Sequence, residues 1–297
     1  MRLIRALKKL KAFQGLTEQE LAWVLYDVGN SAYTMLACSL IPIWFKSIAV
    51  GHAPGQISSD NATAYYSLAV SIVTVAVALL GPVLGALADH KDKKRMYFTS
   101  AAALGMIFCV LTGFAWSWLL FLILFVVTKI CYSASLTIYD SMLGDITTED
   151  RMDEVSSNGF AWGYLGSCIP FLIALIAYVL GPDMVGLIPA LLSRGIGVFV
   201  TAAWWLMVTV PLLLGYTQKN YSSGESASVG AAFRKIFGTL RHIALHDKKV
   251  LFFLIAFFLY IDGVGTIIDN CINIGTDLNL NTVGQVIFLL ATQVVAF

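Results

Sequence analysis

Seven complete apolar stretches follow one another along the chain, and an eighth begins before its last residue. Each complete stretch reaches the roughly 20 residues that a helix needs to cross the hydrocarbon core of a bilayer. Open strands in lipid would leave backbone groups without hydrogen-bond partners, so every stretch is predicted to be helical. The predicted spans are 21–45, 63–88, 96–115, 117–142, 156–180, 195–215 and 249–268, and the incomplete eighth span starts near Thr282.

The composition excludes a soluble protein. Hydrophobic residues make up 58% of the 297 residues and charged residues only 12%, whereas a soluble domain carries about 25% charged residues. We therefore expect a multi-pass protein of the lipid bilayer, with no nucleic-acid partner. The five cysteines include no C-x-x-C pair, and His242 and His246 have no acidic or cysteine partner at ligand spacing. Neither a metal site nor another cofactor is expected.

The basic residues predict the orientation in the membrane. Of the 19 Lys and Arg residues, 16 lie in the N-terminal segment, the 89–95 loop, the 143–155 loop and the polar segment 216–249. These segments alternate with nearly uncharged ones, so the positive-inside rule places them, and the N-terminus, in the cytoplasm. The membrane would be a plasma or inner membrane in a bacterium, or a vacuolar-type membrane in a eukaryote.

The pattern of spans predicts four parts. Residues 1–20 form a basic amphipathic segment, and residues 21–215 form a bundle of six transmembrane helices. Residues 216–248 form a cytoplasmic linker, in which YSSGESASVG is typical of a flexible chain and AAFRKIFGTLRHIALH of a helix on the membrane surface. Residues 249–297 begin a second bundle. The fold class is therefore an all-α polytopic membrane helix bundle.

A tight basic hairpin, GPVLGALADHKDKKR at residues 81–95, joins the second and third spans. Its spacing from Gly85 to Asp89, followed by Lys93 and Lys94, resembles the loop signature G-x-x-x-D-[RK]-x-G-[RK]-[RK] of the major facilitator superfamily. The resemblance implies that these four residues form a loop involved in conformational change. We expect another helix to approach Gly85 and Asp89 to accept hydrogen bonds from a neighbouring helix end.

Two positions of the hairpin depart from this signature. His90 stands in place of the first basic residue, and Asp92 stands in place of the glycine. The alternative interpretation is an ordinary positively charged cytoplasmic loop.

Several longer stretches resemble the vacuole-effluxer-like branch of that superfamily, which includes an autophagy-related amino-acid effluxer. They are AWVLYDVGNSAY (22–33), the 81–95 hairpin, YDSMLGDITTEDRMDEVSSNGFAWGYLG (139–166), AAWWLMVTVPLL (202–213) and FFLYIDGVGTIID (257–269). The resemblance implies a major-facilitator fold of about twelve spans, alternating access, and efflux or exchange of a small, amino-acid-like solute. It also implies a six-span N-terminal half and only the start of the second half in this chain.

Ionisable residues inside the spans are candidates for the substrate or proton pathway, because each is costly to insert into lipid. In the first span, Asp27 shares a helix face with Asn30 and Ser31. The alternative is that these three residues only hydrogen-bond one helix to another.

The fourth and seventh spans supply the other candidates. Lys129 and Asp140 are eleven residues apart and face the same way, as do Asp262 and Asp269 at a spacing of seven. Asp140 is alternatively a charge at the cytoplasmic interface. Lys129 and Asp262 both fall near mid-membrane, and we predict that they pair across the cavity or bind the two charges of a zwitterion. The alternative is that each only stabilises its own bundle.

The loop after the fourth span is rich in charge. A solvated turn and an electrostatic contact with the basic hairpin are both compatible with this loop. Its charged residues are Asp145, Glu149, Asp150, Arg151, Asp153 and Glu154.

These patterns favour a secondary active transporter of a small solute. No Walker loop is present, so a proton gradient acting through buried carboxylates is the simpler energy source. No histidine lies in a span and no H-E-x-x-H or G-x-S-x-G occurs, so an intramembrane enzyme is not expected. The alternative is a non-transporting membrane protein, or a fragment, derived from such a transporter. Because the chain ends in the eighth span, residues 1–297 alone are not expected to transport.

Overall fold

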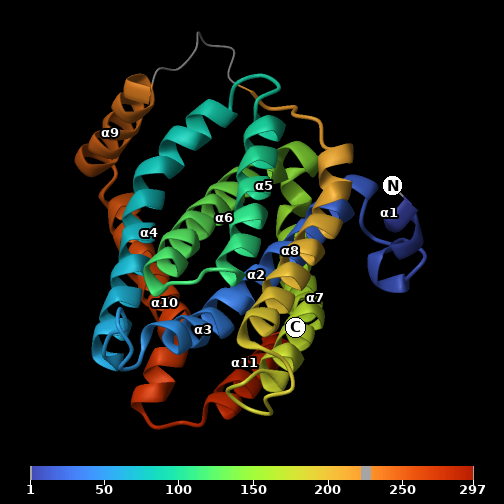
Figure 1. The fold of residues 1–297 in the computed structure, drawn as a ribbon. Helices are drawn as coiled ribbons and strands as arrows, with labels where there is room; N and C mark the ends of the chain where they lie inside the picture. The colour runs from blue at the N-terminus through green and yellow to red at the C-terminus, as the bar shows by residue number, and fades with distance from the viewer. Residues whose placement is uncertain (1, 222–228, 297) are drawn as a thin grey trace.

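The computed structural model describes residues 2–221 and 229–296, and it is built almost entirely from helices (Figure 1). Those ranges contain no β-strand beyond a single bridge between Val50 and Ile57. The all-α prediction is therefore confirmed. The helices are α1 (Arg2–Leu7), α2 (Glu18–Cys38), α3 (Leu40–Ala49), α4 (Ser59–Ala88), α5 (Lys94–Gly113), α6 (Trp118–Ile146), α7 (Met152–Leu180), α8 (Ala190–Gly215), α9 (Val229–His246), α10 (Lys248–Asp277) and α11 (Thr282–Ala296).

Seven helical segments in the described part of the chain are long and apolar enough to cross a membrane. They are α2 continued by α3, then α4, α5, α6, α7, α8 and α10, in agreement with the seven predicted spans. The shorter helix α11 begins at Thr282, where the eighth span was predicted. We call α2–α8 the bundle, and α10 with α11 the C-terminal pair.

Helix α2 is the most deeply buried helix of the bundle, and it packs between α7 and α8. It starts with a capping box, in which Thr17 accepts from the Glu20 amide and Glu20 accepts from the Thr17 amide. The helix breaks at Ser39, and α3 begins at the next residue. Pro42 explains the break, because a proline removes a helical hydrogen bond and clashes with the preceding turn.

The remaining bundle helices pack around α2 in pairs. Helix α5 packs against α6 and α8, and α4 packs against α6. Trp205 of α8 is fully buried in the middle, where its ring contacts the rings of Tyr33 and Tyr132. These aromatic contacts join α2, α6 and α8.

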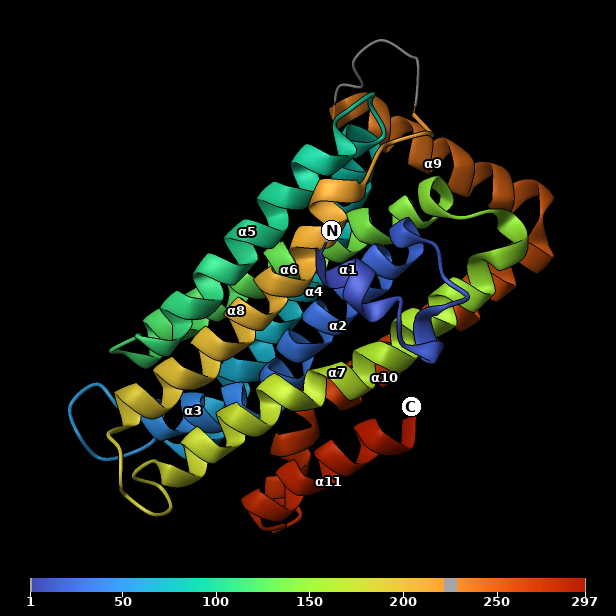
Figure 2. The same cartoon turned by 90° about the vertical axis from the view of Figure 1, so that its right-hand side faces the viewer.

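The C-terminal pair crosses one side of the bundle (Figure 2). Most of α10 is exposed, but Ile272 and Asn273 near its end are buried. Helix α11 packs along α7. The pair therefore touches the bundle mainly at the end of the molecule that lies away from α9 and the N-terminus (Figure 1).

The N-terminal segment and the linker differ in how closely they pack. The amphipathic segment 1–20 inserts Ile4, Phe13 and Leu16 into the hydrophobic core, so its apolar face lies on the bundle. Helix α9 forms at the predicted amphipathic sequence and carries exposed Phe237, Leu240 and Leu245. Most of the predicted flexible linker, at residues 222–228, lies outside the described residues.

Candidate functional site

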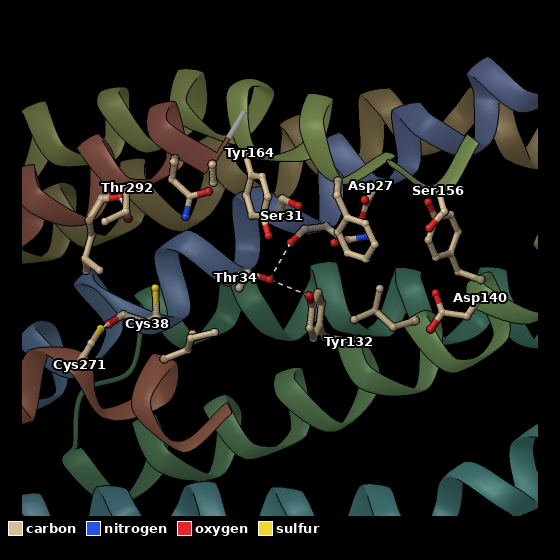
Figure 3. Close-up of a pocket in the computed structure, with 18 of the residues that line it drawn as sticks. Asp27, Ser31, Thr34, Cys38, Tyr132, Asp140, Ser156, Tyr164, Cys271 and Thr292 are labelled. Atoms are coloured by element: carbon tan, nitrogen blue, oxygen red, sulfur yellow. Dashed lines mark hydrogen bonds between the residues drawn. The ribbon is translucent and has the colours of Figure 1, made fainter. Parts of the chain in front are cut away.

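A cavity of about 820 Å³ lies between the bundle and the C-terminal pair (Figure 3). This volume is in the range of small-molecule sites, at roughly 300–1,000 Å³. Helices α2, α6 and α7 form one side, and α10 and α11 form the other. The polar and charged residues that line it are Asp27, Asn30, Ser31, Thr34, Asp140, Ser156, Thr292 and Gln293.

Asp27 lies on the α2 wall of this cavity. Its side chain accepts a hydrogen bond of 3.0 Å from the Asn30 amide, and the whole residue is only 8% exposed. Asp27, Asn30 and Ser31 all line the cavity, so the predicted polar face of the first span points into it. The hydrogen bond between Asn30 and Asp27 lies within α2, so it does not join two helices as the alternative interpretation required.

Two glycines of α7 allow α2 to lie close to it at this point. A Cβ atom at Gly159 would lie 3.2 Å from Asp27 Oδ2 and 2.9 Å from the Trp23 ring. A Cβ atom at Gly163 would lie 2.8 Å from Ser31 Oγ. The two helices can approach this closely only because neither position has a side chain.

Asp140 of α6 also lines the cavity, on the same bundle wall as Asp27 (Figure 3). Beside the two acids, Trp23 of α2 stacks on Tyr139 of α6 with ring centroids 4.4 Å apart. Tyr132 shares a 2.6 Å hydrogen bond with Thr34. Among the described residues, no Lys or Arg forms an ion pair with either acid.

Lys129 pairs with Asp269, and the prediction that it pairs with Asp262 is wrong. The two acids share one face of α10, about two turns apart, so their spacing alone does not distinguish them. Asp269 lies where α10 reaches the bundle, whereas Asp262 lies on the exposed part of the helix. The Lys129 and Asp269 side chains are 14% and 25% exposed. Neither residue lines the cavity, and neither does Asp262.

Further contacts between the bundle and the C-terminal pair gather beside this ion pair. Cys271 donates to the Cys38 carbonyl over 3.3 Å, and Ser67 donates to Asn270 over 3.5 Å. Figure 3 shows Cys38 and Cys271 together at one end of the cavity. These contacts close the cavity at the end that is distant from the N-terminus.

Comparison with known proteins agrees with this architecture. Residues 17–297 match the family model described as vacuole effluxer Atg22 like. The chain belongs to this Atg22-like family. It is 36% identical, over 283 residues, to a Bacillus subtilis (strain 168) protein called uncharacterized MFS-type transporter YxiO. That match covers 94% of this chain and 65% of the relative's length. No solved structure matches.

The family and the seven apolar helices together make this chain an integral multi-pass membrane protein. The resemblance noted in the sequence is thereby confirmed. The fold is consistent with a major-facilitator bundle, as expected from the six-span half followed by a linker and further spans.

The basic hairpin of the Atg22-like chain is anchored by Lys94. This residue is 3% exposed, and its ammonium donates to Asp145 over 3.2 Å and lies 3.9 Å from Asp89. Lys93 is exposed, and no described atom lies within 4 Å of a Cβ built at Gly85. The expected close helix approach at Gly85 is therefore absent from the described part of the structure. The Asp89 carboxylate lies 3.9 Å from the ammonium group of Lys94, which is the first residue of α5.

Asp145 is the centre of this cluster. Its carboxylate accepts from the Tyr216 hydroxyl, from the Lys219 amide over 3.2 Å and from the Asn220 amide over 2.7 Å. Burial and the negative charge of Asp145 raise the pKa of Tyr216. The acidic loop and the basic hairpin are thus in contact, as one of the two sequence interpretations required, and Asp145 also fixes the segment after α8.

The backbone conformation of Asp92 suggests why the loop signature has a glycine at this position. Its φ is +60°, in the left-handed region that side chains other than glycine seldom adopt. Asp is one of the residues that tolerate this region best. The hairpin therefore has left-handed backbone at the position where the signature has a glycine.

The ion pair between Arg151 and Glu20 was not predicted from the sequence. Arg151 lies 3.4 Å from Glu20, and Thr147 donates to the same carboxylate over 2.7 Å. Arg151 also donates to the Gly15 carbonyl over 2.8 Å. The capping box at Thr17 identifies Glu20 as a helix-end residue, but nothing in the sequence assigns Arg151 to it.

Proposed function

We propose that this Atg22-like protein is a secondary active transporter that moves a small solute by alternating access. The observation that supports this most directly is the cavity between the bundle and the C-terminal pair, because its walls come from both parts. A site at such an interface opens to either side when one part rocks against the other. The relative named as an MFS-type transporter supports the same proposal.

The proposed orientation places the N-terminus in the cytoplasm. The clustering of basic residues near the N-terminus, the hairpin and the linker supports it. In that orientation the contacts of Lys129 and Cys38 close the outer end, and the cavity faces the cytoplasm. In a cysteine-free background, a cysteine at Ser59 should react with an impermeant maleimide from outside only, and one at Ser223 from inside only. The reverse pattern would overturn the orientation.

We propose that protons drive the transport through Asp27 and Asp140. Both carboxylates face the cavity without a cationic partner among the described residues, so a bound proton can neutralise them. Asp27 accepts a hydrogen bond from Asn30, and the titratable groups that interact with it are Asp140, Tyr26, Tyr132 and Tyr139. The family description as a vacuole effluxer supports efflux as the mode of transport. An amino-acid-like solute is the expectation from the resemblance.

The test measures solute-driven proton flux in proteoliposomes that contain the complete protein, including any residues that follow 297 in its gene. A pH-sensitive dye inside the vesicles reports proton movement when a panel of amino acids and amines is added. At least one compound should cause saturable proton flux that Asp27→Asn and Asp140→Asn each reduce at least tenfold. Asp60→Asn, a change of an exposed acid in the first turn of α4, is the matched control. A solute flux whose rate does not change with the pH gradient would refute proton coupling.

A further inference from the structure

We propose that Cys38 and Cys271 form a reversible redox site, which a small organic disulfide that enters the cavity oxidises to a disulfide bond. This site goes beyond the proposed function, and only its effect on transport rests on that function. Three observations carry the proposal. The two thiols contact each other, both line the cavity, and they belong to the two parts that meet at its closed end.

The break after α2 explains why these two side chains meet. Pro42 stands four residues after Cys38 and has no N–H, so the Cys38 carbonyl lacks the donor that a continuous helix would supply. The Cys271 thiol of α10 takes that place and donates to the Cys38 carbonyl over 3.3 Å. The two thiol groups also interact directly with each other. Their side chains lie side by side in Figure 3.

A small molecule can reach both thiols through the cavity. Cys38 is only 5% exposed and Cys271 is half-buried, but both line the cavity of about 820 Å³. The three other cysteines, Cys109, Cys131 and Cys168, do not line it. An oxidant inside the cavity therefore meets this pair of thiols, and it meets the more exposed Cys271 first.

The oxidation proceeds by two successive thiol–disulfide exchanges. The Cys271 thiolate attacks one sulfur of the small disulfide, which breaks the S–S bond of that molecule, forms a mixed disulfide and releases one small thiol. The Cys38 thiolate then attacks the Cys271 sulfur, which releases the second small thiol and leaves the bond between Cys38 and Cys271. The two protein thiols lose two protons and two electrons, and the small disulfide gains them to become two thiols. An excess of small thiol reverses both steps.

The new bond would hold this end of the cavity closed. Cys38 belongs to the bundle and Cys271 to the C-terminal pair, and the ion pair of Lys129 with Asp269 lies beside them. The noncovalent contacts there can separate and form again, whereas a disulfide keeps the two Cα atoms within about 4.4–6.8 Å of each other. Oxidation should therefore stop alternating access with this end closed, and reduction should restore it.

Peptide mapping tests the site without any transport measurement. The complete purified protein, including any residues that follow 297 in its gene, is incubated with 2-mercaptoethanol and its disulfide, then alkylated and digested. Peptides joined through Cys38 and Cys271 should appear, and these two thiols should be lost at least tenfold faster than that of Cys131. Cys271→Ser should abolish the joined peptides, while the matched control Cys131→Ser should not change them. Thiols that stay reduced, or a mixed disulfide on Cys271 that Cys38 never resolves, would overturn the proposal.

Hydrogen exchange and flux then test the closure. Oxidation should slow amide exchange in the α10 peptide around Cys271 at least tenfold in the wild type, and should not change it in Cys38→Ser. Solute-driven proton flux in proteoliposomes should fall at least tenfold on oxidation and return with reductant. Flux or exchange that full oxidation leaves unchanged would refute the closure and keep the proposed function. A disulfide with slowed exchange, in a protein that shows no flux of any solute, would keep this site and refute the proposed function.

Discussion

The ammonium group of Lys129 on α6 and the carboxylate of Asp269 on α10 form an ion pair that joins the bundle to the C-terminal pair. Both side chains are largely buried, so each charge depends on the other for compensation. The pair lies beside the contact between Cys38 and Cys271, at the end of the cavity that is distant from the N-terminus. Lys129 and Asp269 must separate if this end of the cavity opens.

Removing one member of this ion pair should therefore destabilise the protein. Lys129→Met or Asp269→Asn should each cost about 1–3 kcal/mol, less than for a fully buried pair because both side chains are partly exposed. The charge swap Lys129→Asp with Asp269→Lys should recover more than half of that loss. The unfolding temperature of the purified protein measures it, and Asp262→Asn on the exposed part of α10 is the control. Additive effects of the two charge changes would show that the residues do not interact.

The close packing of α7 on α2 gives a second prediction. Gly163→Leu should destabilise the protein by about 1–3 kcal/mol, because the new side chain would collide with Ser31. The matched change Gly263→Leu should be nearly neutral, since no described atom lies within 4 Å of a Cβ at that position. Yield of monodisperse protein and unfolding temperature report both. Equal losses in the two variants would mean that the glycine contact does not determine the packing.

Hydropathy was enough to predict the spans, because crossing lipid demands an apolar helix whatever its neighbours are. It could not choose the partner of Lys129. Asp262 and Asp269 share a helix face, and only the tilt of α10 against the bundle brings the second one within reach. The same limit applies to Arg151 and Glu20, whose contact depends on how the turn after α6 folds back.

The candidate site was predicted only in part for a similar reason. The spacing of Asp27, Asn30 and Ser31 placed them on one face, and that face lines the cavity. The packing of α7 had a readable signal, since Gly159 and Gly163 form a small-x-x-x-small pattern. Nothing in the sequence indicated that Ser156 and Thr292 line the cavity, because ordinary polar residues near helix ends are common.

The bond between Tyr216 and Asp145 predicts a change of stability at alkaline pH. Burial and the Asp145 charge raise the pKa of Tyr216 in the folded protein, while its value in the unfolded chain is about 10. The Tyr216 hydroxyl therefore stays protonated to higher pH in the folded state than in the unfolded chain. Its contribution to the free energy of unfolding is complete below about pH 10 and falls as the pH rises further. Unfolding of wild type and Tyr216→Phe should be compared between roughly pH 8 and pH 11. An equal alkaline decline in both proteins would contradict the prediction.

The neighbouring thiols of Cys38 and Cys271 offer a test of which end of the cavity is closed. Oxygen with copper phenanthroline should convert the two thiols to a disulfide, with two protons and two electrons passing to the oxidant. Because α2 and α10 contact each other there, peptide mapping should find this disulfide, and reductant should reverse it. Cys38→Ser should abolish it, while the buried Cys109 stays available for alkylation after unfolding. Failure to form it in the wild type would place the two helices farther apart.

Helix α10 contacts the bundle near Cys271, and most of the helix before that residue is exposed. A rotation about the contact at Cys271 would therefore move the start of α10 the most. From Cys271 back to Lys248 the helix extends about 35 Å at 1.5 Å per residue. A rotation of about 10° at Cys271 would move the far end by about 6 Å, a distance similar to one helical turn. A slight loosening beside Cys38 is thereby magnified at the start of α10, where α9 is attached. Spin or fluorescent labels on α9 and on the 89–95 hairpin should therefore report the motion with the greatest amplitude.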